Sequence, residues 1–274
     1  MTDQVLWEGR VGASWAQEWR RTDRSFNGLT DTILGAARAA SFTRALDIGC
    51  GAGEISLALA REHTRAEITG IDVSKRLIDV ARNRGVRLPN LQFATDDAAG
   101  WSPDAWQPDL LISRHGVMFF ANPVDAFANL AAQAAEDARL IFSCFRSPSE
   151  NPWAQRVREL LPADPSPVGD PYAAGPFAFA DPAYVESTLA RSGWTDVVIE
   201  PADFAYIAGA GENALDDAVS YFQRIGPAAA AAAELPDTDR EAFAGRLRAF
   251  LRNYQDGELV AMKGAAWLVR ARKG

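Results

Sequence analysis

A glycine-rich stretch between an apolar run and a helix-forming segment is the first feature with chemical meaning. The run 46–48 leads into Gly49, Gly51 and Gly53, and Glu54 follows them. Glycines at a strand-to-helix turn let the backbone turn sharply and approach a ligand closely, with the amides of the helix facing it. The stretch therefore predicts a ligand-binding loop.

The spacing of these glycines separates classes of nucleotide ligand. A dinucleotide-binding loop has the form Gly-x-Gly-x-x-Gly, and the position of its third glycine is Glu54 here. An acid beside a pyrophosphate is unfavourable, and the Gly-Lys-Ser/Thr of a phosphate-binding P-loop is missing from the sequence. Acids at Asp47 and Glu54 instead suit a ligand that carries positive charge and no phosphate.

Further acids follow the next apolar runs of the chain. Asp72 ends the second run, 19 residues after Gly53. A carboxylate there can accept two hydrogen bonds from the vicinal hydroxyls of a ribose; the alternative is an acid that caps a helix before Ser74. Asp96 and Asp97 follow the third run, where an acid either accepts from an adenine amino group or belongs to a solvated turn. In an open α/β sheet these strand ends meet at the edge where ligands bind.

Short apolar runs that alternate with helical stretches predict the elements that position these residues. Five runs fit strands, at 44–48, 66–71, 91–94, 109–113 and 140–145. A helix at about 182–191, a strand at 194–200 and a final strand at 259–270 continue the alternation. This pattern predicts an α/β domain with a mostly parallel sheet.

Three segments lie outside the alternation. The first forty residues have a helical pattern that includes Trp7, Trp15 and Trp19; these tryptophans either pack a helix on the main body or close a ligand pocket as a lid. Residues 147–181 hold seven prolines, too many for regular elements. Residues 211–254 have a helical pattern again.

Composition excludes several classes of protein. The chain has 274 residues with 28 basic and 36 acidic side chains, a net charge of −8, which disfavours a nucleic-acid backbone or an anionic membrane surface as the main partner. No run approaches the roughly 20 apolar residues that span a bilayer, and the first residues do not resemble a secretory signal. Two cysteines and two histidines exclude a disulfide scaffold and supply a zinc site poorly. We expect a cytoplasmic protein without a metal site.

Four pieces of the sequence resemble the class I S-adenosyl-L-methionine-dependent methyltransferases: 46–53, 70–74, 93–98 and 109–114. Together they span roughly residues 43–145. The wider chain, including 113–120 and 151–153, is similar to a bacterial branch loosely grouped with quinone-biosynthesis C-methyltransferases. The resemblance implies a Rossmann-like, seven-stranded, mostly parallel sheet whose last strand is antiparallel, with helices on both faces and helical lid insertions. We expect a single methyltransferase domain, 1–274, comprising an N-terminal helical cap (1–41), a cofactor-binding core (42–146) and inserted cover segments (147–181 and 211–254).

The resemblance also implies which residues bind S-adenosyl-L-methionine. The methionine end of the cofactor is held by the loop, and the adenosine by the ends of the next strands. The implied residues are Asp47 with the amides of Gly49, Gly51 and Gly53 for the methionine end, Asp72 for the ribose hydroxyls, Val73 for the adenine face, Asp97 with the Ala98 amide for the adenine edge, and Ser113 for the methionine side.

Residues after the fourth strand are candidates for contact with the methyl acceptor. His115 is predicted to act as a general base, which contributes about 10²–10⁴-fold when the nucleophile is a hydroxyl or an acidic carbon; the alternative is a wall of the site. Arg114 either holds an anionic or carbonyl group of the substrate or pairs with a helix acid. Phe119 and Trp153, with other aromatic residues, either line an apolar cavity or form the seams of the cover helices.

The leading functional hypothesis is methyl transfer from S-adenosyl-L-methionine to a small apolar or aromatic molecule, which leaves S-adenosyl-L-homocysteine. A nicotinamide dinucleotide oxidoreductase is an alternative that Glu54 argues against. A protein that binds the cofactor without turnover is a second alternative. The expected partner is a small molecule rather than a nucleic acid or a membrane, and the chain is compatible with a homo-oligomer.

Overall fold

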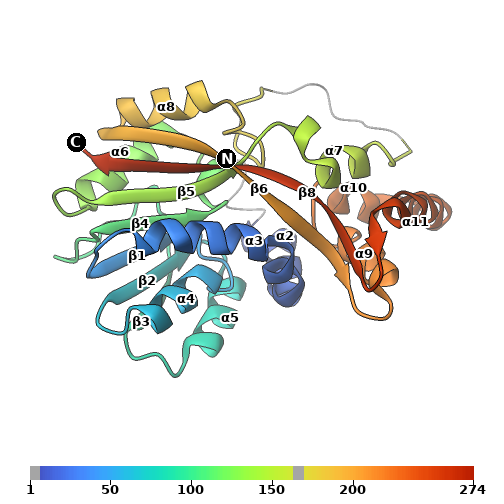
Figure 1. The fold of residues 1–274 in the computed structure, drawn as a ribbon, viewed down its shortest axis with the longest axis horizontal. Coiled ribbons are helices and arrows are strands. Elements are labelled where there is room, and N and C mark those ends of the chain that lie inside the picture. The colour runs from blue at the N-terminus through green and yellow to red at the C-terminus, as the bar shows by residue number, and fades with distance from the viewer. Residues whose placement is uncertain (1–6, 163–169) are drawn as a thin grey trace.

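One mixed β-sheet organises the structure, a computed structural model that describes residues 7–162 and 170–274. The strand order is β3-β2-β1-β4-β5-β8-β6 (Figure 1). The strands are β1 (Arg44–Ile48), β2 (Glu67–Asp72), β3 (Leu91–Thr95), β4 (Leu110–Arg114), β5 (Arg139–Phe145), β6 (Trp194–Ala210) and β8 (Leu259–Lys273). Parts of the predicted N-terminal cap (1–6) and of the first cover segment (163–169, with Pro165 and Pro167) lie outside the described residues.

Strand direction matches the sheet that the sequence predicts. Strands β1 to β5 pair in parallel, whereas β8 runs antiparallel to both of its neighbours, β5 and β6. A two-residue strand, β7 (Gln255–Asp256), pairs with β8 outside this order. The central strands β4 and β5 are buried along almost their whole length, because helices cover both faces of a parallel sheet. The predicted Rossmann-like sheet with an antiparallel last strand is therefore confirmed.

Helices follow the strands as the alternation predicts. They are α4 (Glu54–Glu62), α5 (Lys75–Gly85), α6 (Pro123–Gln133) and α8 (Pro182–Arg191). In Figure 1, α4 lies in front of the strands and α6 behind them. Each helix returns the chain to the opposite edge, so the next parallel strand ends on the same side as the last. This geometry gathers the carboxyl ends of β1 to β4 at one edge.

The described part of the N-terminal segment, residues 7–41, is mostly helical, as its periodicity predicts. Helix α2 (Arg10–Gln17) ends at Glu18, and α3 (Trp19–Arg38) follows directly. The Glu18 carboxylate is buried and pairs with the guanidinium groups of Arg21 and Arg224. Helix α3 packs along β6 and β5 and touches α4 (Figure 1).

Strands β6 and β8 are longer than the sequence patterns indicate. We predict a strand only at 194–200, but β6 continues to Ala210. Residues 201–206 alternate between exposed and buried positions with the two-residue period of a strand. Pro201 costs no ladder hydrogen bond because β6 is the edge strand. The two strands extend beyond the sheet and carry α9 (Ala214–Phe222), α10 (Ala229–Glu234) and α11 (Asp237–Leu251) at their far end (Figure 1).

The proline-rich segment contains regular structure, contrary to our expectation. A 3₁₀ turn at Pro148–Glu150 leads into α7 (Pro152–Arg158). Proline at the first position of a helix replaces an N–H that has no partner inside the helix, so Pro152 starts α7 rather than preventing it. The helix buries Trp153, Ala154 and Val157, which brings Trp153 to the carboxyl end of β5.

Candidate active site

The loop between β1 and α4 has the backbone geometry that its glycines allow. Gly49, Gly51 and Gly53 have φ values of 63°, 54° and 84°, in the left-handed region that favours glycine. A Cβ atom at Gly49 would lie 2.8 Å from the Cα of Gly116, whereas one at Gly51 would meet nothing within 4 Å. Two loops therefore pack backbone against backbone at Gly49, and Gly51 borders open space that a ligand can fill.

Asp72 links this loop to the end of β2. Its Oδ2 accepts a hydrogen bond from the Gly51 N–H at 2.9 Å, and its Oδ1 accepts from the Ser74 N–H at 2.8 Å. Burial raises the pKa of the Asp72 carboxyl, and the two amides partly oppose that rise. Each carboxylate oxygen keeps lone-pair capacity for a further donor. Ser74 precedes the first residue of α5, so Asp72 bonds no amide of the helix itself, and its ribose contact stays a prediction.

Ser74 is the N-cap residue of α5, but its hydroxyl makes no capping hydrogen bond. The buried Ser74 Oγ has no partner among the described residues. A Cβ atom at Gly12 of α2 would lie 2.5 Å from this oxygen. Helix α2 therefore packs directly against the end of β2, over a buried hydroxyl that has no hydrogen-bond partner among the described residues.

Asp47 is a fully buried acid on β1. Its Oδ2 accepts hydrogen bonds from the backbone N–H of Ser56 at 3.0 Å and from the Ser56 hydroxyl at 2.5 Å. Burial raises the pKa of Asp47 to about 6, although the Ser56 hydrogen bonds and the charge of Arg114 lower it. A buried carboxylate with a perturbed pKa at a ligand edge is typical of a functional site.

The end of β3 lies next to Asp72. The Asp96 N–H donates to the Asp72 carbonyl at 3.1 Å. Asp97 is exposed and accepts from the Ala99 N–H at 2.9 Å, while Ala98 is buried. Val73, Asp97 and Ala98 therefore lie on loops that meet at one edge of the sheet.

Ser113, on β4, joins two strand ends. Its hydroxyl donates to the Ile48 carbonyl at 2.7 Å and accepts from the Gly116 N–H at 3.1 Å. Both hydrogen bonds tie the turn after β4 to the glycine loop. Ser113 is fully buried, so the structure gives it a role in shaping this side of the site.

Arg114 is paired within the chain. Its guanidinium contacts the Glu54 carboxylate of α4, donates to the Thr30 hydroxyl of α3 at 2.7 Å, and lies 3.9 Å from the Asp23 carboxylate. The Arg114, Glu54 and Asp23 side chains are only 14%, 17% and 17% exposed. Of the two sequence interpretations of Arg114, pairing with a helix acid is the one seen here. The same contact neutralises Glu54, one of the two acids expected beside a cationic ligand.

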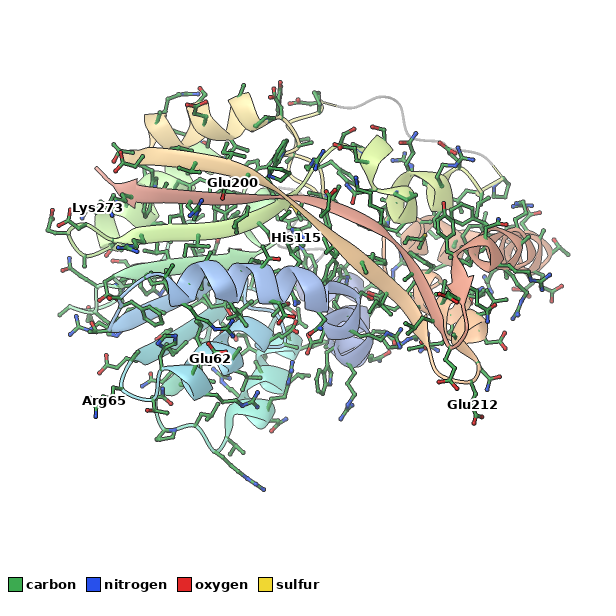
Figure 2. All side chains as sticks on the ribbon, viewed as in Figure 1. Glu62, Arg65, His115, Glu200, Glu212 and Lys273 are labelled. Carbon is green, nitrogen blue, oxygen red and sulfur yellow. The ribbon has the colours of Figure 1, made fainter. Side chains whose placement is uncertain are left out.

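His115 occupies the centre of the molecule, near the crossing of β6 and β8 in Figure 2. Its side chain is 8% exposed, and the ring stacks on Phe145 with centroids 3.8 Å apart. Nδ1 lies 3.4 Å from the Ser143 hydroxyl, and Nε2 has no partner among the described residues. His115 is thus a fixed imidazole with one unsatisfied nitrogen.

Two apolar candidates lie on different sides of this edge. Phe119 meets Trp7 edge-on, with centroids 5.3 Å apart. Trp153 stacks on Tyr206 at 4.7 Å and donates from Nε1 to the buried Asn151 side chain at 3.0 Å. Trp153 also packs on Phe145, the ring that stacks on His115, whereas Phe119 belongs to the contact with the N-terminal segment.

Sequence reasoning missed the residues that surround the imidazole. Ser143 on β5, Phe26 on α3 and Phe145 on β5 contact the His115 ring and were not predicted as site residues. Ser143 had a signal, because it is the one hydroxyl in the apolar run 140–145. The aromatic residues had none, since their contacts join segments far apart in the chain.

The described residues contain no helix long and apolar enough to cross a membrane. In the same part of the chain, no three or more His, Cys, Asp or Glu side chains gather as a metal site would require.

Comparisons with known proteins add to this geometry. Residues 45–136 match a protein family described as "Methyltransferase domain". A trans-aconitate 2-methyltransferase of Methylobacterium radiotolerans is 30% identical over 133 residues, which cover 48% of this chain and 49% of that protein. The chain thus spans about half the length of this relative. A protein of the same name from Paracidovorax citrulli is 27% identical over 220 residues, 76% of this chain and 83% of that protein.

A solved structure shows the same fold. The YcgJ protein from Bacillus subtilis superposes with a TM-score of 0.57 at 16% identity, over 89% of this chain and 97% of that one. The glycine loop with its strand-end acids and the sequence matches support a class I S-adenosyl-L-methionine-dependent methyltransferase, and the strand order and the YcgJ structure agree in fold.

Proposed function

We propose that this chain transfers a methyl group from S-adenosyl-L-methionine to a small molecule with an apolar or aromatic framework, leaving S-adenosyl-L-homocysteine. The observation that carries the proposal is the joining of the glycine loop to β2 through the Gly51–Asp72 hydrogen bond. It sets a carboxylate with free lone pairs beside the open space at Gly51. His115 lies after β4, on the same edge of the sheet.

The residues at this edge fit the cofactor. The left-handed glycine loop leaves room at Gly51, the buried Ser74 hydroxyl has no partner among the described residues, and Asp47 holds a buried acid suited to a cation. When bound, S-adenosyl-L-methionine supplies a methyl group already activated by a sulfonium. The protein's task is then to position the acceptor and keep water out, and positioning is worth about 7–11 kcal/mol.

We assign the cofactor contacts that the resemblance implies. Asp47 and the loop amides of Gly49, Gly51 and Gly53 bind the methionine end, and Asp72 binds the ribose hydroxyls. Adenine is covered by Val73 and read by Asp97 and the Ala98 amide, while Ser113 supports the methionine side. The Ser113 hydroxyl acts indirectly, through its hydrogen bonds to the Ile48 carbonyl and the Gly116 N–H.

On the acceptor side, we propose that His115 contacts the reacting group, with Phe119 and Trp153 excluding water. The aromatic surroundings of His115 support an acceptor with an apolar or aromatic framework. We assign Arg114 to holding α3 and α4 in place, because its charge is already engaged by acids of both helices. We also propose a cytoplasmic location and small-molecule partners, in keeping with the net charge of −8.

Two measurements test the proposed function. Calorimetric titration with S-adenosyl-L-methionine and with NAD compares the cofactor classes, and we expect binding of the first alone. Release of S-adenosyl-L-homocysteine over a panel of aromatic and aliphatic acids and alcohols then tests turnover. Binding of NAD without S-adenosyl-L-methionine would favour an oxidoreductase, whereas cofactor binding without release from any acceptor would favour a binding protein.

A further inference from the structure

The backbone and ring of His115 are held by β5. His115 has a φ of 62°, which is uncommon for a residue other than glycine, and its N–H donates to the Ser143 carbonyl at 3.2 Å. The ring stacks on Phe145 and meets Phe26 edge-on with centroids 5.4 Å apart. These contacts fix the orientation of the imidazole, so the position of its proton decides what it offers to a ligand.

The imidazole of His115 is neutral near pH 7. Burial lowers its pKa well below the usual value, and the neighbouring charge of Arg114 lowers it further, against a smaller opposing effect of the Ser143 backbone contact. A neutral imidazole has one N–H and one bare nitrogen. The two tautomers therefore present opposite hydrogen-bonding groups at Nε2.

The hydroxyl of Ser143 distinguishes the tautomers. It lies 3.4 Å from Nδ1, and within residues 7–162 and 170–274 it has no second partner. A proton on Nδ1 would leave two groups without a hydrogen-bond partner, the Ser143 O–H and the bare Nε2. A proton on Nε2 lets the Ser143 hydroxyl donate to Nδ1 and leaves only the Nε2–H without a hydrogen-bond partner. Buried polar groups without partners are costly, which favours the arrangement with one.

We propose that Ser143 is a positioning residue that fixes His115 as the Nε2–H tautomer, and that this N–H donates a hydrogen bond to an acceptor oxygen that arrives already ionised. The proposal rests on the proposed function, since it takes His115 to face the methyl acceptor. It assigns His115 a different role from the general base predicted from the sequence. The substrate class it names is an organic acid, a carboxylate or a comparably acidic enol, on an apolar or aromatic framework.

The chemistry of such an acceptor balances without a base. The ionised oxygen gives the electron pair of the new oxygen–carbon bond, and the pair of the broken carbon–sulfur bond returns to sulfur. No proton moves, and Nε2 keeps its hydrogen throughout. A donor at this place orients the oxygen, whereas an unprotonated Nε2 would face it with a lone pair and repel it.

Nitrogen-15 NMR of labelled histidine tests the tautomer directly. The chain has two histidines, His63 and His115, so the His63→Gln variant leaves a single imidazole to observe. We expect the proton on Nε2 and a bare Nδ1 near pH 7.5. A proton on Nδ1 would overturn the proposal.

Serine variants test the positioning role. Ser143→Ala removes the donor to Nδ1 and is expected to yield a mixture of tautomers, and Ser143→Thr is expected to restore the single Nε2–H form. Ser192→Ala, which removes another buried serine hydroxyl at the end of α8, is the matched control and leaves the tautomer unchanged. An unchanged tautomer in Ser143→Ala would refute the role of Ser143.

A matched pair of acceptors tests the substrate class. We expect release of S-adenosyl-L-homocysteine with cinnamate to exceed that with cinnamyl alcohol by at least about tenfold. A preference for the alcohol would overturn the assignment of an ionised acceptor. These outcomes are separable from the proposed function, because the tautomer is measured without cofactor or turnover, and a protein that does not bind S-adenosyl-L-methionine fails the proposed function alone.

Discussion

Removing the Arg114 guanidinium should destabilise the fold, because two acids would lose their buried counter-charge. Arg114 contacts Glu54 and lies 3.9 Å from Asp23, and all three side chains are mostly buried. Breaking a buried pair from one side costs about 3–5 kcal/mol. Asp23 keeps a second partner, Arg84, at 2.7 Å, so we expect the lower end, about 3 kcal/mol, for Arg114→Met.

Urea unfolding measures this loss as a lower free energy of unfolding, and thermal unfolding as a midpoint lower by about 6–10 °C. Adding Glu54→Gln removes the orphaned charge, so the double variant should recover about half of the loss. The pair Lys75–Asp79 is the control, since its side chains are 74% and 49% exposed. Lys75→Met should change stability by less than about 0.5 kcal/mol.

A free energy of unfolding for Arg114→Met within about 0.5 kcal/mol of the unchanged chain would refute the reasoning. The same result would favour the other sequence interpretation, in which the Arg114 guanidinium binds an anionic or carbonyl group of the substrate. Cofactor binding by the double variant Arg114→Met, Glu54→Gln separates the two roles further, and we expect it to be retained.

Three other predictions follow from the site. Asp47→Asn should stabilise the protein by about 1–3 kcal/mol at about pH 7.5 and by less at about pH 5. The folded pKa of Asp47 is about 6, above the usual 3.8, so the unchanged chain loses stability as the pH rises through this range. Urea unfolding at both pH values measures the effect, and a variant less stable than the unchanged chain at the higher pH would contradict it. Asp72→Ala should weaken S-adenosyl-L-methionine binding about 100-fold or more by calorimetry, since one carboxylate oxygen holds the glycine loop at Gly51 and the other holds the turn at Ser74. Unchanged affinity would contradict the placement. Gly12→Val should displace α2 and speed the deuterium exchange of its amides, because a Cβ there would lie 1.9 Å from the Trp7 carbonyl. Gly35→Ala is the control, since a Cβ there meets nothing within 4 Å. Equal exchange of α2 in both variants would refute the close contact.

Local patterns account for the cofactor side of the site. Gly49, Gly51 and Gly53 are close in sequence, and the left-handed conformations they adopt depend on the turn itself. Asp72 could be predicted because a parallel sheet brings the end of β2 to the same edge as the end of β1. Predicting these residues therefore does not depend on contacts between distant segments of the chain.

The acceptor side depends on contacts between distant segments. Arg114 reaches Glu54 and Thr30, 60 and 84 residues away, so the choice between a substrate cation and a structural one was open in the sequence. The Ser143 contact to His115 follows from the pairing of β4 with β5. The sequence does not predict α7, because seven prolines indicate irregular structure, although Pro152 stands where a helix tolerates a proline.

Calorimetric titration of the chain with S-adenosyl-L-methionine tests the central claim most directly, with Asp72→Ala and NAD measured alongside. The account predicts saturable binding of one cofactor per chain, a loss of about 100-fold in Asp72→Ala, and no heat from NAD. Binding of NAD in place of S-adenosyl-L-methionine, or cofactor affinity unaffected by Asp72→Ala, would contradict it.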